Sequence, residues 1–254
     1  MDWGRAKSVL IIAFLLLNMV LGYQLWMEWR ERIDSAVDWT SLPPEAQQAM
    51  SSKGIRVEAE IPTETPEMLE QLTYSLKETP TSGTGARIML NPQPNTRVVY
   101  FDEELETALG SVIPELNQYH LYSLGSGDGV FVLNRTFDGW PIFDINIEFY
   151  YSEQKITAYR QDVVESLSPE DSKRQKVLPA TMAVAKLIAS YLPAGSTIRE
   201  IQLGYHGQIF DSEIQLAAPS WRVLLDDGEV YYVNAISGEV VTDKEKTGSA
   251  GLPE

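Results

Sequence analysis

A long apolar run near the amino terminus constrains this chain more than any other feature of its sequence. From Val9 to Trp26 only Asn18 and Gln24 are clearly polar. A helix needs about 20 mostly apolar residues to cross the hydrocarbon core of a bilayer. The run is longer than the apolar core of a usual secretory signal, and no small-residue cleavage motif follows it. We therefore expect an uncleaved transmembrane helix over residues 8–27.

The flanking charges do not decide the orientation of this helix. Arg5 and Lys7 precede it and Arg30 and Arg32 follow it, so both sides carry equal numbers of basic residues. The segment before the helix, residues 1–7, is short, whereas a large acidic domain follows. This asymmetry favours a single-pass protein of the cell membrane with a cytoplasmic N-terminal tail and an extracellular C-terminal domain.

One face of the predicted helix carries a polar residue and a small residue at membrane depth. Four residues, spaced by three, four and three positions, share this face: Leu15, Asn18, Gly22 and Leu25. Small residues let helices approach closely, and an asparagine amide in hydrocarbon needs a hydrogen-bond partner. We take this face as a candidate partner-binding site in a homo- or hetero-oligomer. The alternative is that Asn18 bonds to its own helix and Gly22 is incidental.

Composition limits what the rest of the chain can bind. Asp and Glu number 36 against 20 Lys and Arg, and the net charge of −16 argues against nucleic acid as a partner. The chain has no cysteine, which excludes disulfides and thiolate chemistry. Its apolar fraction of 44% is that of a folded chain with a core of its own.

The segment after the membrane helix is predicted to be a stalk followed by a first α+β unit. Residues 28–52 are charged, with spaced apolar positions and a Pro-Pro break, which is typical of a juxtamembrane stalk. Residues 53–170 mix helical and strand periods. The elements expected there are a strand at 55–61, a helix from Thr65 with a stripe of Leu69, Leu72 and Leu76, strands at 87–90 and 97–101, a helix from Asp102 with a stripe of Leu105, Leu109, Val112 and Leu116, and strands at 119–124, 130–137 and 156–164.

The strongest strand signal lies in the middle of the chain. Apolar side chains alternate with polar ones from Phe143 to Tyr151, and the polar positions are Asp144, Asn146 and Glu148. Period-two alternation over nine residues predicts an antiparallel strand with one face buried.

The arrangement recurs in a second α+β unit, residues 171–243. A helix opening at Pro179 has a stripe of Val184, Leu187, Ile188 and Tyr191, and strands are expected at 197–205, 221–225, 230–233 and 240–241. Residues 244–254 are polar and are expected to be a flexible tail. The fold class is therefore α+β, with two successive units of a helix plus an antiparallel sheet.

Residues with the patterns of an enzyme or a metal site are missing. His120 and His206 are the only histidines, and isolation from companion ligands makes each a predicted strand-surface residue. Asp226 and Asp227 fit a turn better than a catalytic pair. The Gly125–Gly129 loop lacks the carboxylate ladder of a calcium loop. We expect no catalytic residue, no cofactor, no metal and no small-molecule substrate.

Two sets of motifs resemble known families. The segment Trp221–Val240 resembles the PepSY pattern of W-x-V, a turn, an apolar strand and V-[DN]-A-x-[ST]-G-x-V. The chain over residues 1–243 resembles the YycI family more closely. The residues that carry this likeness are Met1-Asp2-Trp3 with Lys7, Asn18, Tyr23-Gln24, Gly139-Trp140-Pro141-Ile142-Phe143 and Tyr159-Arg160-Gln161.

The resemblance to YycI implies a function that the residues alone do not show. Members are bitopic membrane proteins of low-GC Gram-positive bacteria that act with the related YycH on the sensor histidine kinase WalK (YycG), which controls cell-wall metabolism. It implies a non-enzymatic regulator with an extracytoplasmic, YycH-like domain and an inward N-terminus. The PepSY likeness leaves an alternative, an anchored inhibitor or chaperone of a secreted peptidase. A cell-wall hydrolase is the least favoured reading, because no acid, base or metal ligands converge.

Overall fold

The structure is a computed structural model of the chain. It describes residues 14–21, 23, 42–77, 87–91, 102–121, 129–169, 174–207 and 213–242. Residues 14–21 and 23 are helical, in agreement with the apolar pattern of the sequence. The rest of the predicted membrane helix and the tail at 244–254 lie outside the described residues.

Most described strands belong to one mixed sheet, and the α+β class is confirmed. Its main path is β14 (Val240–Thr242), β13 (Val230–Asn234), β12 (Gln215–Leu225), β11 (Thr197–His206), β7 (Trp140–Ser152), β6 (Val130–Phe137) and β5 (Tyr119–His120). Further strands branch from it: β8 (Lys155–Gln161) on β7, β4 (Ile88–Met89) on β8, β1 (Arg56–Val57) on β11, and β3 (Leu72–Leu76) on β12, with β9 (Val164–Pro169) beside β3. β2 (Met68–Leu69) and β10 (Gln175–Lys176) form a separate pair.

The alternating strand is found, and its apolar positions enter one core from Ile145 onward. β7 buries Ile145, Ile147 and Phe149 in that core, with Asn146 and Glu148 partly buried between them. Phe143 is also buried but does not belong to this core, and the Asp144 side chain is only 4% exposed. A tight turn joins β6 to β7, where Gly139 has a φ of 81° that favours glycine. The long hairpin therefore presents one apolar face to a core.

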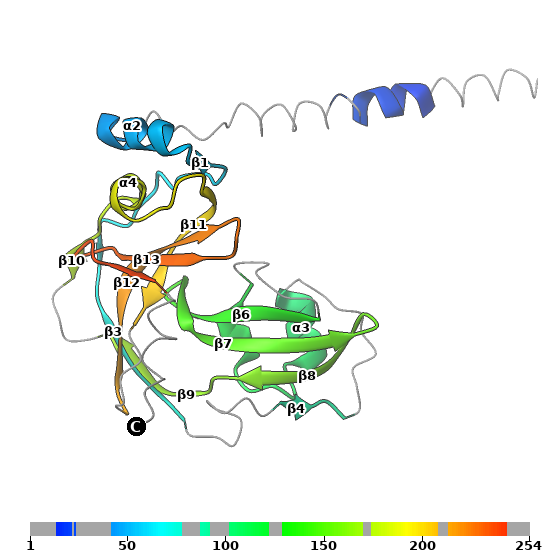
Figure 1. Cartoon of the computed structure of the whole chain (residues 1–254). Coiled ribbons are helices and arrows are strands. Elements are labelled where there is room, and N and C mark those ends of the chain that lie inside the picture. The colour runs from blue at the N-terminus through cyan, green and yellow to red at the C-terminus, as the bar shows by residue number, and fades with distance from the viewer. Residues whose placement is uncertain are drawn as a thin grey trace, which may run out of the picture.

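This face packs on α3 (Asp102–Leu109) (Figure 1). It also packs on η2 (Leu116–Gln118), a short 3₁₀ helix that follows α3. Leu105 and Leu109 of the predicted helical stripe are buried, but Val112 is 57% exposed. The helix ends at Leu109, so Val112 leaves the stripe while Ile113 and Leu116 enter the core. The predicted strand at 97–101 lies outside the described residues.

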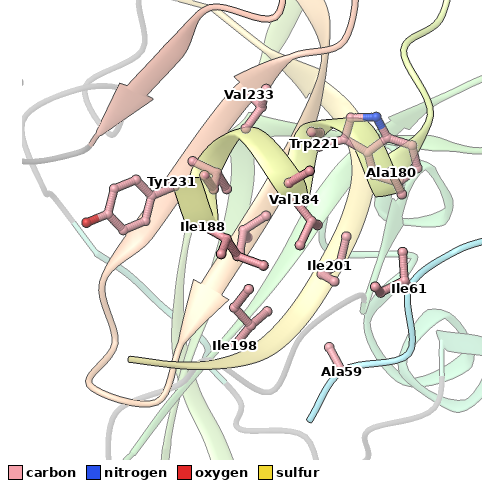
Figure 2. Packing of buried hydrophobic residues seen from close by; sticks show 14 of the residues in the cluster. Ala59, Ile61, Ala180, Val184, Ile188, Ile198, Ile201, Trp221, Tyr231 and Val233 are labelled. Atoms are coloured by element: carbon pink, nitrogen blue, oxygen red, sulfur yellow. The ribbon is translucent and has the colours of Figure 1, made fainter. Parts of the chain in front are cut away.

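A second core lies between the β11–β13 strands and α4 (Ala180–Ser190) (Figure 2). Figure 2 shows Val184 and Ile188 of α4 among side chains of the sheet, with Trp221 at one side. Trp221 is 1% exposed, and its indole Nε1 donates a hydrogen bond to Leu178 O at 2.7 Å. Tyr191, which the stripe of the sequence included, lies beyond the end of α4 and is exposed.

The helix predicted from Thr65 is wrong, because the structure has β2 and β3 there. Leu72, Tyr74 and Leu76 also alternate with Thr73 and Ser75, and this period-two pattern is the one that is used. β3 pairs with β9 on one side and with the first part of β12 on the other. These distant partners override a leucine spacing that fits a helix equally well.

The structure also differs from the expected stalk at residues 42–52. Leu42, Ala46 and Met50 are buried in the second core, and they belong to or border α2 (Pro44–Lys53), which packs on α4 (Figure 1). The Lys53 ammonium donates to Ile188 O at 2.8 Å and Ala189 O at 3.1 Å. It thereby caps the carbonyl end of α4, where a cation is favoured. The second proline of the Pro-Pro pair, Pro44, is the first residue of this helix, because proline fits a first helical position.

The two cores share chain segments across residue 170. Ala59 and Ile61 lie in the core with α4, whereas Tyr205 and Ala217 lie in the core with α3. The strand predicted at 55–61 keeps its alternating burial, but its regular strand is limited to Arg56 and Val57, followed by backbone hydrogen bonds from Glu58 and Ala59 to Ile198 O. The proposed unit boundary at residue 170 therefore does not separate the cores.

Candidate functional site

The structure describes half of the candidate membrane face. Leu15 and Asn18 lie on the described helix with exposed side chains, whereas Gly22 and Leu25 lie outside the described residues. The Asn18 Nδ2 donates a hydrogen bond to Phe14 O, one turn earlier, at 3.0 Å. This is the local bond of the alternative interpretation. It occupies one of the two N–H donors of the amide, so the partner-binding face stays a prediction.

In the described part of the chain, no single helix has both the length and the apolar character to cross a membrane.

Two halves of the sheet meet at a junction between β7 and β11. β7 and β11 run parallel and pair at one point, Tyr205 with Ile142. Beside it, a Cβ on Gly204 would lie 2.5 Å from Pro141 O and 2.6 Å from the Phe143 ring. Only glycine permits this approach, so Gly204 sets how closely the two strands join.

His206 lies at this junction and not on the strand surface, which corrects the prediction. It is 6% exposed, and its Nδ1 lies 3.1 Å from Asp144 Oδ2. The same carboxylate oxygen accepts the Gly207 N–H at 2.8 Å. The contact between the His206 and Asp144 side chains is close but lacks the alignment of a hydrogen bond. The cost of burying this polar ring is offset by its contact with the Asp144 carboxylate and by its stacking on Tyr232.

Aromatic rings extend this cluster over the sheet face that α4 does not cover. The Tyr232 ring stacks on His206 at 3.6 Å with planes 9° apart, and the Phe143 ring lies 5.7 Å from Tyr232. The Arg222 guanidinium lies 4.6 Å above Phe143. It also donates to Gln202 at 2.8 Å and pairs with Glu200. This face thus combines stacked rings with a held cation.

A pocket of about 240 Å³ opens on the same face, and we call it the β11–β14 pocket. Its lining comes from the end of β11, from β12, β13 and β14, and from the segment before β3. The lining residues are Gln71, His206, Gly207, Leu216, Ala218, Ser220, Tyr232, Asn234, Glu239 and Val241.

A separate polar group lies on β7 and β8, in the other half of the sheet. Partial burial would raise the pKa of Glu148, but hydrogen bonds from Arg160, at 2.5 Å, and Tyr150 outweigh it and hold the pKa below its ordinary value. Burial raises the pKa of Asp162, although its carboxylate accepts the Asn146 N–H at 3.1 Å. Hydrogen bonds hold these groups in place, and none of them pairs a nucleophile with a general base.

The other candidates from the sequence have structural roles or fall outside the described residues. Asp227 Oδ1 accepts the Glu229 N–H at 2.9 Å, which confirms its turn-forming role. Of the Gly125–Gly129 loop only Gly129 is described. Across the described ranges, no three His, Asp or Glu side chains gather closely enough to hold a metal ion.

Sequence reasoning missed the junction cluster. The alternation of β7 put Asp144 on the polar face, but nothing in the sequence pairs that position with His206, 62 residues later. One signal was present: Gly204 lies inside a predicted strand, and a glycine inside a strand often marks a close backbone approach.

The fold is an α+β domain with a mixed sheet, one face of which carries paired charges and stacked rings. Residues 95–236 match the YycI protein family. The match covers more than half of the 254 residues, so this chain belongs to the YycI family. The family is a regulatory, non-enzymatic one of membrane-anchored proteins, and membership implies an accessory role toward the WalK kinase.

Comparisons with curated proteins and with solved structures do not extend this family assignment. No curated protein sequence matches this chain. Among solved structures, the chain is similar to an uncharacterized protein from Eubacterium rectale ATCC 33656, with 16% identity and a TM-score of 0.31. The similar region covers 44% of this chain and 41% of that protein, which is less than half the length of either.

Proposed function

We propose that this chain is a membrane-anchored accessory regulator of the WalK (YycG) sensor histidine kinase and acts together with a YycH-like partner. Family membership over residues 95–236 is the observation that carries this proposal. The helix at residues 8–27 anchors the chain with its N-terminus in the cytoplasm, and the domain lies outside the cell. In this arrangement the regulated process is cell-wall metabolism.

The proposed mechanism needs contacts that distinguish two kinase states. A bound regulator shifts an equilibrium only by the difference between its contact free energies with the two states. The face of Leu15, Asn18, Gly22 and Leu25 supplies contacts within the bilayer, where close packing and one interhelical hydrogen bond act together. The local bond of Asn18 to Phe14 O leaves the other amide N–H and the amide oxygen available to a partner helix.

The folded domain supplies the second set of contacts. The sheet face with Phe143, Arg222 and Tyr232 has the composition of protein interfaces, in which aromatic residues and arginine are enriched. The partner in this proposal is a protein, since the chain carries a net charge of −16 that repels nucleic acid.

Co-purification from membranes tests the helix contact. We expect replacement of Asn18 and Gly22 by Leu to reduce recovery of the kinase with the full-length chain by about fivefold, since an interhelical hydrogen bond contributes on the order of 1 kcal/mol. Val20→Leu, on another side of the same helix, serves as the control and should leave recovery unchanged.

Two outcomes would count against the proposal. Unchanged kinase recovery and kinase output in the Asn18 and Gly22 variants would remove the helix face from the mechanism. Recovery of a secreted peptidase in place of the kinase, after cross-linking in intact membranes, would favour the anchored-inhibitor alternative.

A further inference from the structure

Acidic side chains lie at the edge of the β11–β14 pocket and close to its lining. Glu239 at its edge is exposed, and no lining residue is Lys or Arg. Next to His206, which lines the pocket, the Asp144 carboxylate lies 3.1 Å from Nδ1 of the histidine. The Asp144 side chain is only 4% exposed. A carboxylate in such a poorly solvated place acts over a longer range than one in water. Negative charge therefore lies at the edge of the pocket and next to His206 in its lining.

The His206 and Tyr232 rings form part of the pocket lining. The His206 ring lies against the Asp144 carboxylate and is stacked on Tyr232. The face of a tyrosine ring attracts cations, so the Tyr232 ring suits a cationic group.

The remaining walls suit the stem of a long side chain. Leu216, Val241 and the Tyr232 ring are apolar surfaces, while Gln71, Ser220 and Asn234 provide polar atoms around them. Lysine and arginine bury an aliphatic stem along apolar surface and keep a charged head among acceptors. A volume of about 240 Å³ has room for one such side chain and not for a drug-sized ligand.

We propose that the β11–β14 pocket receives a single lysine or arginine side chain from the protein that docks on this sheet face. The inference rests on the proposed function, because it assumes a protein partner for the domain. It adds the chemistry that the partner must present at this point: a cationic group at the end of a flexible apolar stem, approaching along the edge of β14.

Small probes test the pocket without the kinase or a YycH-like protein. The full-length chain in lipid nanodiscs is titrated with N-acetyl-lysine methylamide and N-acetyl-arginine methylamide, and binding is followed by NMR signals of His206 and Tyr232. The neutral isostere, N-acetyl-norleucine methylamide, is the ligand control. We expect saturable, weak binding of at least one cationic probe, about fivefold or more tighter than that of norleucine.

Three variants sharpen the measurement. Glu239→Gln removes the rim charge from an exposed side chain and should weaken cationic binding by about threefold to fivefold. Glu165→Gln makes the same change in charge at an exposed position of β9 and should leave binding unchanged. Leu216→Trp fills the pocket from a partly exposed position and should abolish binding.

Equal binding of the norleucine and cationic probes, or no saturable binding of either, would overturn the pocket proposal. Equal losses in Glu239→Gln and Glu165→Gln would overturn it as well, because general acidity would then explain the attraction. These outcomes are separate from the failure of the proposed function, which kinase recovery in membranes measures.

Discussion

Individual carboxyl groups of this domain have opposite ionisation behaviour although they lie close together. Burial raises the pKa of Asp162, and the nearby charge of Glu148 adds to the increase. The pKa of Glu148 is lowered despite partial burial, because Arg160 and Tyr150 donate hydrogen bonds to it. The balance between burial and hydrogen-bond donors at each carboxylate decides the direction of its pKa shift.

The raised pKa of Asp162 predicts a pH-dependent effect on stability. In the unfolded chain an aspartate has a pKa of about 3.9. Because the folded pKa is higher, the wild type loses stability as pH rises from the unfolded to the folded pKa, and the penalty remains at neutral pH. Asp162→Asn escapes this penalty and can still accept the Asn146 N–H. We expect the variant to be more stable than the wild type at pH 7.

Urea unfolding at several pH values measures this effect. The advantage of Asp162→Asn should shrink as the pH falls toward the ordinary range of an aspartate. Glu165→Gln, at an exposed position of β9, is the control and should show a small, pH-independent difference. An Asp162→Asn advantage that is the same at pH 7 and pH 4 would show that ionisation does not cause it.

Pairing decides the structure of individual elements where the sequence period is ambiguous. Residues 65–76 place leucines at helical spacing, yet Leu72–Leu76 is a strand between β9 and β12. Thr73 lies opposite Ser168 on one side and Leu216 on the other. Leu72, Thr73 and Tyr74 have strand partners on both sides, which offers their backbone groups hydrogen bonds, so the neighbours outweigh local spacing.

Substitutions at Thr73 distinguish a strand from a helix in solution. Alanine favours a helix, whereas isoleucine favours a strand. We therefore expect Thr73→Ala to lower the free energy of unfolding by about 1 kcal/mol and Thr73→Ile to retain or raise it. Urea denaturation of the two variants checks this order. The reverse order would indicate that these residues are helical.

The whole domain is held together by segments that are distant in the chain. α2 packs on α4, β1 pairs in parallel with β11, and β12 pairs with β3 through its first residues and with β11 through the rest. One strand therefore reaches both halves of the sheet, and each core contains residues from both halves of the chain. Unfolding is expected to be cooperative across this interleaved arrangement.

A substitution in α2 tests whether this helix belongs to the folded domain. Met50 is 8% exposed in the core beside α4, so Met50→Ala should lower the free energy of unfolding by about 2–3 kcal/mol. Ser51→Ala, on the exposed side of the same helix, should change it by no more than about 0.5 kcal/mol. Equal, small effects of both substitutions would indicate an independent stalk.

Local patterns of sufficient length could be predicted from the sequence alone. The alternation at 143–151, the apolar stripe of α4 and the turn at Asp226–Gly228 were each strong enough to define an element. The family likeness, which rests on short motifs at fixed positions, could be predicted too and is confirmed over residues 95–236. These features are encoded within a few neighbouring residues, where periodicity and turn chemistry act directly.

Only the tertiary structure decided the features that depend on distant partners. In the structure, residues 72–76 form a strand, α2 contributes to a core, and His206 lies beside Asp144. No local period specifies these outcomes, since each requires that two segments far apart in the chain meet. The free energy of burial and of satisfied hydrogen bonds belongs to the assembled contact and not to either segment alone.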